Sequence, residues 1–238
     1  MNNTKNKLGQ ATGFAVDNWQ ACQWPPRQTI EGRYCRIEAY DPDRHNADLF
    51  EAFAKDSEQG NWTYLPYGPF DQFEDFDNWS RSACQGDDPL FHSIIDKASD
   101  KPVGMASYLR IVPDVGVIEV GHIHFSPLMQ KTAISTEAMY LMMKRVFDEL
   151  GYRRYEWKCD SFNAPSCTAA KRLGFQFEGI FRQATMYKNR NRDTAWFAII
   201  DQDWPVMKQA FERWLDSDNF DQKGCQKQSL KDFVTTEA

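Results

Sequence analysis

Three side chains that could move a proton lie close together in the stretch 117–138, whose first half is rich in β-forming residues. Glu119 carries a carboxylate, and His122 and His124 carry imidazoles that titrate near neutral pH. In a regular strand the two histidines point to one face, whereas a bulge would separate them. The set predicts acid–base chemistry; the alternative is that Glu119 only pairs with a basic neighbour such as Arg110. No third ligand at suitable spacing accompanies the histidines, so we expect no metal site.

The second half of the same stretch predicts an anion site. A proline-marked exit from the strand leads into a short polar loop and then into a helix with an apolar stripe that stops at Gly151. A loop that feeds a helix N-terminus directs several unpaired backbone N–H groups and the positive end of the helix dipole to one place, most often for a phosphate. The candidate residues are Gln130, Lys131, Thr132, Ala133, Ile134 and Ser135.

The flanking patterns predict one domain with a mixed sheet. Alternation predicts strands near 33–40, 90–96, 102–111, 152–159, 175–187 and 194–201, and apolar spacing predicts helices after a cap at Asp43, over 73–84, over 163–172 and from Trp204. We expect an N-terminal arm over 1–29 anchored by Trp19 and Trp24, the domain over 30–216, and a polar, loosely ordered tail over 217–238.

Two further segments could contact a substrate. The loop 62–70 is crowded with aromatic residues, including Trp62, Tyr64 and Tyr67, which either pack on one another or form a pocket wall. Arg190 and Arg192 fall in a predicted hairpin between the late strands. They form either a solvated basic turn or a guanidinium pair that recognises a carboxylate or phosphate.

Composition excludes some functions. The 238 residues carry a formal net charge of −6, which argues against nucleic-acid binding as the main activity. The six cysteines show no CxxC spacing, so we expect reduced, mostly structural thiols and a cytoplasmic protein. No stretch has the length of a membrane helix, so we expect no membrane association.

Several motifs in order resemble one family. The run 130–138, Gln-Lys-Thr-Ala-Ile-Ser-Thr-Glu-Ala, is similar to the Arg/Gln-Gly-x-Gly-x-Ala-Thr-Glu-Ala loop of the GNAT N-acetyltransferase superfamily. Asn163-Ala-Pro-Ser166, Leu173-Gly-Phe175 and Glu178-Gly179 resemble its Asn-x-x-Ser and Leu-Gly-Phe-x-x-Glu-Gly signature. The likeness covers about residues 31–205, and the subgroup typified by ribosomal-protein N-terminal acetyltransferases is the most similar.

The resemblance implies a fold and a reaction. The fold is a mixed, mostly antiparallel central sheet with helices on both faces and a V-shaped splay between central strands. The reaction is transfer of an acetyl group from acetyl-CoA to an amine by direct attack in a ternary complex, with the pyrophosphate in the loop 130–135. The acceptor would be a small amine or a protein N-terminus, and a homodimer is possible. Asn163 would reach the pantetheine arm or cap its helix, and Ser166 would assist the departing thiolate.

The sequence departs from the family pattern at three positions. Lys131 and Ala133 stand where the family usually has glycines, and Ala170 stands where many members have a tyrosine that protonates the thiolate. A CoA-binding sensor or regulatory module without turnover is therefore the alternative function. A nucleotide-binding enzyme that uses the same loop is a third possibility.

Overall fold

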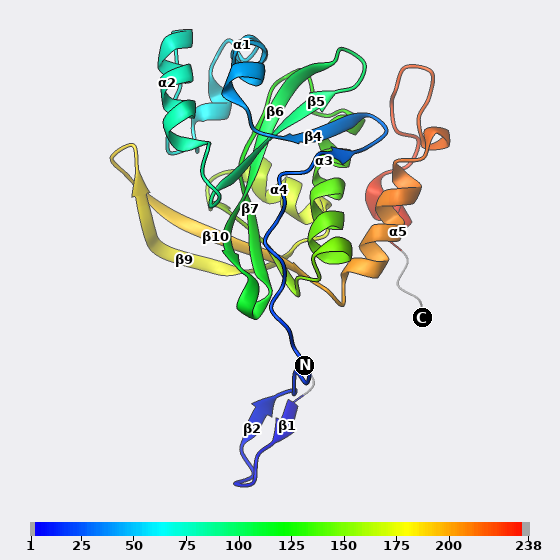
Figure 1. Cartoon of the computed structure of the whole chain (residues 1–238). Coiled ribbons are helices and arrows are strands. Elements are labelled where there is room, and N and C mark those ends of the chain that lie inside the picture. Colours follow the sequence, from blue (N-terminus) through cyan, green and yellow to red (C-terminus); the bar gives the residue numbers. More distant parts are fainter. Residues whose placement is uncertain (1–2, 235–238) are drawn as a thin grey trace.

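The computed structural model describes residues 3–234 and shows a central sheet flanked by helices (Figure 1). The strands are β1 (Asn3–Lys5), β2 (Ala11–Gly13), β3 (Ile30–Glu31), β4 (Cys35–Ala39), β5 (Leu90–Asp96), β6 (Lys101–Val112), β7 (Val117–Phe125), β8 (Arg154–Asp160), β9 (Gln176–Tyr187) and β10 (Arg190–Ile200). The α-helices are α1 (Pro42–Phe53), α2 (Phe73–Ala83), α3 (Ala133–Lys144), α4 (Ala164–Arg172) and α5 (Trp204–Trp214), and a π-helical turn, Arg145–Glu149, extends α3.

The eight strands of the main sheet run in the order β3-β4-β5-β6-β7-β8-β10-β9. Every neighbouring pair is antiparallel except β7 and β8, which are parallel and pair only from Val117 with Arg154 to Val120 with Trp157. Beyond that point the two strands pair no further, so the sheet splays at its centre. The predicted mixed, mostly antiparallel fold is confirmed.

Helices cover both faces of this sheet, and each face has its own core. On one side α1 and α2 enclose an aromatic cluster that includes Phe53, Trp62 and Phe76. On the other side the larger core takes residues from α3, α4 and α5. Because successive strand residues alternate in direction, Met105 of β6 belongs to the first core and Ala106 to the second.

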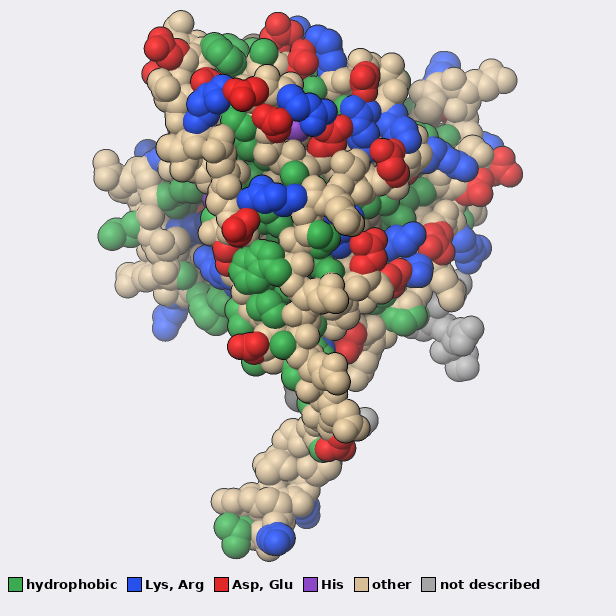
Figure 2. All heavy atoms as spheres, viewed as in Figure 1, with side chains coloured by type: hydrophobic (Ala, Val, Ile, Leu, Met, Phe, Trp, Pro, Cys, Tyr) green, Lys and Arg blue, Asp and Glu red, His purple; other side chains and the backbone are tan. Residues whose placement is uncertain are grey.

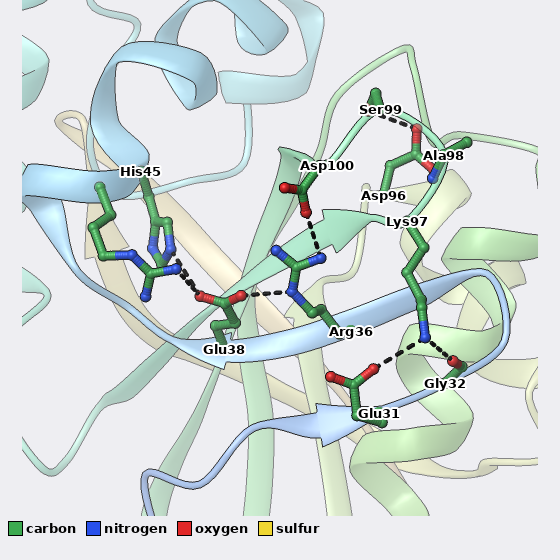
Figure 3. A network of polar contacts seen from close by, with 11 residues as sticks. Glu31, Gly32, Arg36, Glu38, His45, Asp96, Lys97, Ala98, Ser99 and Asp100 are labelled. Carbon is green, nitrogen blue, oxygen red and sulfur yellow. Dashed lines mark hydrogen bonds and ion pairs between the residues drawn. The ribbon is translucent and has the colours of Figure 1, made fainter.

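The predicted cap of the first helix is wrong by two residues. Asp41, and not Asp43, is the N-cap: its side chain accepts a hydrogen bond from the backbone N–H of Asp43, and Pro42 begins the helix, where no N–H is required. An ion-pair network on β4 lies beside this helix (Figure 3). Arg36 contacts Glu38 at 2.6 Å and Asp100 at 2.6 Å, and Glu38 also meets the imidazole of His45.

One buried carboxylate fixes α3 to the edge of the sheet. Glu137 accepts hydrogen bonds from the backbone N–H groups of Arg33, Tyr34 and Cys35, at 2.7, 2.7 and 2.8 Å. Charged acceptors make hydrogen bonds stronger than neutral ones, so three on one carboxylate hold the first turns of α3 firmly. The position of the helix N-terminus is thereby set.

The two ends of the chain differ. The β1–β2 hairpin projects away from the body (Figures 1 and 2), and the arm behind it is attached by Trp19, whose Nε1 donates to the carbonyl of Asp114 at 2.7 Å. Trp24 is 44 % exposed and is a weaker anchor than expected. The expectation of a loose C-terminal tail is wrong for residues 217–234, because Leu230 and Phe233 are buried in the core beside α5.

Candidate functional site

A β-bulge interrupts β7 where the sheet begins to splay. Met105 pairs with His124 and Ser107 with Gly121, so two residues of β7 oppose one of β6. His122, in the bulge, has a φ of 50°. A bulge leaves its extra residue outside the ladder, which makes backbone groups available to a ligand.

The bulge borders a cavity of about 300 Å³, here called the charged cavity. Six of the predicted site residues line it: Glu119, His122, Tyr64, Asn163, Ser166 and Arg192. They come from β7, β10, α4 with its N-cap and the loop before α2, so the fold brings together residues from distant parts of the chain. Arg110, Lys158 and Asp160 add further charges to the lining.

Glu119 is buried and paired with two cations. Its carboxylate meets the guanidinium of Arg110 and lies 2.8 Å from the ammonium of Lys158. The ammonium of Lys158 also lies 2.6 Å from the carboxylate of Glu156 and over the ring of Trp196. The structural pairing of Glu119 with Arg110 is therefore present, and the same carboxylate also lines the cavity.

The bulge separates the two histidines. His122 lines the charged cavity, and its Nδ1 is 3.2 Å from the hydroxyl of Tyr67. Burial, together with the charges of Arg110 and Arg192, lowers the pKa of His122 to about 4, so its imidazole is neutral at pH 7.

His124 lies behind the cavity wall. Its ring stacks on Phe53 with 3.9 Å between ring centroids, and Trp62 packs edge-on against it. Burial lowers the pKa of His124 to about 3. His124 is a neutral core side chain here and makes no contact with the charged cavity.

A second cavity, of about 630 Å³, lies at the N-terminus of α3 and is here called the α3 cavity. Five predicted residues of the loop line it: Gln130, Lys131, Thr132, Ala133 and Ser135. The helix begins at Ala133, so the last of these belong to its first turn and not to the loop.

No side chain caps α3 among the described residues. The hydroxyl of the N-cap Thr132 donates to the carbonyl of Met129, and the hydroxyl of Ser135 donates to the carbonyl of Thr132. The first-turn N–H groups therefore have no side-chain acceptor, and such groups attract an anion. Lys131 adopts a φ of 59°, so the loop reaches a left-handed conformation without glycine.

The outer wall of the α3 cavity comes from residues that the sequence did not reveal. Arg172 of α4 lines it from one side, while Trp214, Phe220 and the tail residues 224–226 line it from the other. The Trp214 Nε1–H donates to Gln226 at 2.9 Å, which holds this part of the tail against α5. Arg172 directly precedes the Leu173-Gly-Phe175 motif, and neither that position nor anything local in the tail indicates a cavity wall.

The two cavities meet at Trp157, which lines both. Its indole N–H donates to the hydroxyl of Ser166 at 2.9 Å, a bond in which the hydroxyl oxygen accepts and the hydroxyl hydrogen is not used. Asn163 caps α4, because its side-chain oxygen accepts from the backbone N–H of Ser166 at 3.1 Å. Of the two roles expected of Asn163, the cap of α4 is therefore present.

Besides His124, four predicted residues lie outside both linings. Ile134 packs against the core. Trp62 is buried in the aromatic cluster, and Tyr67 lies behind His122. Arg190 is exposed at the first residue of β10, opposite Tyr187; the turn is formed by Lys188 and Asn189, so neither arginine lies in it.

The sequence profile of the acetyltransferase (GNAT) domain matches residues 36–176, more than half of the chain. The chain belongs to the GNAT family. A GCN5-related N-acetyltransferase from Brucella melitensis is 46% identical, with a TM-score of 0.90 over 92% of this chain and 99% of that one. A probable GNAT acetyltransferase from Chromobacterium violaceum is 41% identical, with a TM-score of 0.76 over 82% of this chain and 96% of that one.

A curated relative agrees with this assignment. The uncharacterized N-acetyltransferase YnaD of Bacillus subtilis is 25% identical over 141 residues, which is 59% of this chain and 81% of the relative. GNAT enzymes use acetyl-CoA, and the α3 cavity of this family member has the volume and the unpaired N–H groups that a phosphate-bearing ligand requires.

Residues 3–234 contain neither a cluster of metal ligands nor a membrane-spanning helix. No group of three His, Cys, Asp or Glu residues there could hold a metal ion. None of the helices described has both the length and the apolar character needed to cross a bilayer.

Proposed function

We propose that this protein transfers an acetyl group from acetyl-CoA to a primary amine, with the cofactor in the α3 cavity and the acceptor in the charged cavity. The observation that carries the proposal is the meeting of the two cavities at Trp157. A thioester that passes this point from the helix end would face Glu119 and the β7 bulge. The nucleotide end of the cofactor would then lie toward Arg172 and the tail.

Each residue at the junction has a chemical task. The Glu119 carboxylate accepts a proton from the attacking amine, directly or through a water molecule. A backbone N–H of the bulge, near Gly121–Ile123, donates to the carbonyl oxygen as negative charge develops on it. As the carbon–sulfur bond breaks, the Ser166 hydroxyl donates to the sulfur, since it receives its own hydrogen bond from Trp157. His122 stays neutral and lines the wall.

The anion site supports the same assignment. First-turn N–H groups without side-chain acceptors, the ammonium of Lys131 and the guanidinium of Arg172 border one cavity, and together they suit a pyrophosphate. Lys131 takes the left-handed conformation in place of glycine. Because the loop forms in spite of its missing glycines, their absence does not favour a regulatory module over an enzyme.

We also propose an acceptor class, a cellular compartment and an oligomeric state. The resemblance to ribosomal-protein N-terminal acetyltransferases makes a protein N-terminus one candidate, and a small amine is the other. All six cysteines lie in the described part of the chain and are free thiols, which supports a reducing, cytoplasmic compartment. A homodimer is also proposed, and its test is the molecular mass in solution.

The test is release of free CoA from acetyl-CoA with a panel of amines, measured together with calorimetric CoA affinity. We expect saturable CoA binding and amine-dependent release. Tight binding with no release on any acceptor would instead support the regulatory module. Thermal protection by ATP but not by acetyl-CoA would support a nucleotide-binding enzyme.

A further inference from the structure

The charged cavity holds one cation that has no ion-pair partner among the described residues. Of its three basic residues, Arg110 and Lys158 both pair with Glu119. Arg192 forms no ion pair with any of residues 3–234, and its buried Nε has no hydrogen-bond partner. A partly buried cation without a partner costs free energy unless a ligand supplies the opposite charge.

The carboxylates near Arg192 are engaged elsewhere. Asp160 accepts from the hydroxyl of Tyr187 at 2.8 Å and from the backbone N–H of Phe162 at 2.9 Å. Asp193, the next residue on β10, accepts from the backbone of Gln183 and from the side chain of Asn191. Arg192 therefore remains available to an anion that enters the cavity.

The cofactor does not account for this cation. In the proposed arrangement its phosphates lie in the α3 cavity, which Lys131 and Arg172 border and Arg192 does not. Arg192 lines the other cavity, together with Glu119 and His122. The remaining partner is the acceptor itself.

We infer that the acceptor carries a carboxylate or a phosphate in addition to its amine, and that Arg192 binds this acidic group while the amine is directed to Glu119. The inference rests on the proposed function and narrows its substrate class. A guanidinium can grip either group with two parallel hydrogen bonds, which fixes orientation as well as charge. The volume of about 300 Å³ suits a small amino acid, a phosphorylated amine or the first residues of a peptide.

Matched acceptors test this inference. The pairs are the α-amides of glutamate and glutamine, β-alanine with its amide, phosphoethanolamine with ethanolamine, and the C-terminally amidated dipeptide Ser-Asp with amidated Ser-Asn. We expect the wild-type kcat/KM to favour an acidic member by about 10-fold or more, the scale of one charge-assisted contact. The pair that responds most strongly distinguishes a carboxylate from a phosphate, and a small molecule from a protein N-terminus.

The variants are Arg192→Gln and Arg192→Lys, with Arg190→Gln as the matched control on the same strand. Arg190 is exposed and lines neither cavity. We expect Arg192→Gln to raise KM for the acidic acceptor and to abolish the preference, while kcat/KM for its neutral partner stays within about 2-fold. Arg192→Lys should restore part of the preference. Arg190→Gln should behave as wild type, and CoA affinity should not change in any variant.

Where amines do release CoA, three results would overturn the inference: no acidic preference in the wild type, an equal fall in kcat for acidic and neutral acceptors in Arg192→Gln, or a loss of CoA affinity in that variant. Thermal protection by the same acceptors in the presence of CoA provides a readout that needs no turnover. Protection by acidic members that depends on Arg192, without CoA release, would contradict the proposed function and leave the inference standing. If acidic acceptors give no thermal protection and no kinetic preference is found, the inference is rejected.

Discussion

The two cavities are built by different means. The inner wall of the α3 cavity comes mainly from one stretch of chain, residues 130–136 without Ile134, and the proposed phosphate site consists of backbone N–H groups at a helix end. The charged cavity gathers single side chains from β7, β8, β10 and α4, and its character comes from how their charges pair. If the two cavities hold the cofactor and the acceptor as proposed, cofactor binding should tolerate side-chain changes that acceptor binding would not.

The strongest test of this contrast concerns Glu119. Replacing it with glutamine removes the proposed base, and we expect kcat to fall about 100-fold or more. Glu156→Gln is the matched control, because Glu156 is also buried and pairs with the same Lys158 but does not line the charged cavity. Steady-state CoA release checks both. Equal losses in the two variants would assign Glu119 to the ion-pair network alone.

Two buried histidines, His124 and His92, predict a pH dependence of stability. Burial holds the pKa of His124 at about 3, whereas the unfolded chain binds that proton near pH 6.5. The unfolded state thus binds more protons as pH falls below about 6.5, and native stability is lost in that window. His92, with a pKa of about 4 from burial and the nearby Arg145, acts in the same direction.

Urea unfolding at pH 7 and pH 5 measures this effect. Each of these two histidines should contribute a loss of about 2 kcal/mol between pH 6.5 and 5, at about 1.4 kcal/mol per pH unit. In the His124→Phe variant, the total loss of unfolding free energy should be smaller by the contribution of one histidine, about 2 kcal/mol. A variant with the full wild-type pH dependence would show that His124 is not held neutral in the native state.

The tail provides a test on the cofactor side. Phe220 lines the α3 cavity and packs against Trp214, so Phe220→Ala removes part of the proposed nucleotide wall. We expect acetyl-CoA affinity to fall about 10-fold, the scale of one aromatic contact. Affinity for acetyl-phosphopantetheine, which lacks the nucleotide, should stay unchanged. Equal loss for both ligands by calorimetry would mean that the tail acts only through the fold.

The junction between the cavities can be probed at Asn163. Asn163→Ala removes the cap of α4, worth about 1 kcal/mol, and should weaken acetyl-CoA binding about 5-fold. Asn163→Ser retains a capping oxygen and should recover most of the affinity. If the Asn163→Ser variant binds acetyl-CoA no better than Asn163→Ala does, Asn163 contributes to binding through a direct amide contact and not through the cap.

The smallest expected effect is at Lys131. Lys131→Gly relieves a left-handed backbone and should raise unfolding free energy by about 0.5–1 kcal/mol, while acetyl-CoA affinity falls a few-fold at low salt. Gln59→Gly is the control, since Gln59 has a φ of 57° and lies outside both cavities. Equal affinities of wild type and Lys131→Gly at low salt would remove Lys131 from the phosphate site.

What the sequence could predict follows from how local each feature is. The loop and helix over 130–150 and the cap at Asn163 depend on neighbouring residues, and both were found. The aromatic loop was ambiguous, because its pattern cannot tell Tyr64, which lines the charged cavity, from Trp62, which is buried in the core. Packing decides between them.

The tail was misjudged for a related reason. Its polar composition predicts disorder, yet a few apolar residues are enough to hold it: Phe220, Leu230 and Phe233 pack near α5. The tail thereby lines the same cavity as the loop 130–136, from which it is far away in the sequence. The pairing state of Arg192 was equally inaccessible, since it depends on which carboxylates are already engaged by partners on other strands.

The most direct test of the two-cavity arrangement is a crystal structure with CoA bound. We expect the pyrophosphate within hydrogen-bonding distance of the backbone N–H groups at residues 132–135, the adenosine toward Phe220, and the sulfur beside Trp157, facing Glu119. A CoA molecule whose phosphates lie away from the α3 N-terminus, or whose sulfur does not reach the charged cavity, would contradict the proposed division between the two cavities.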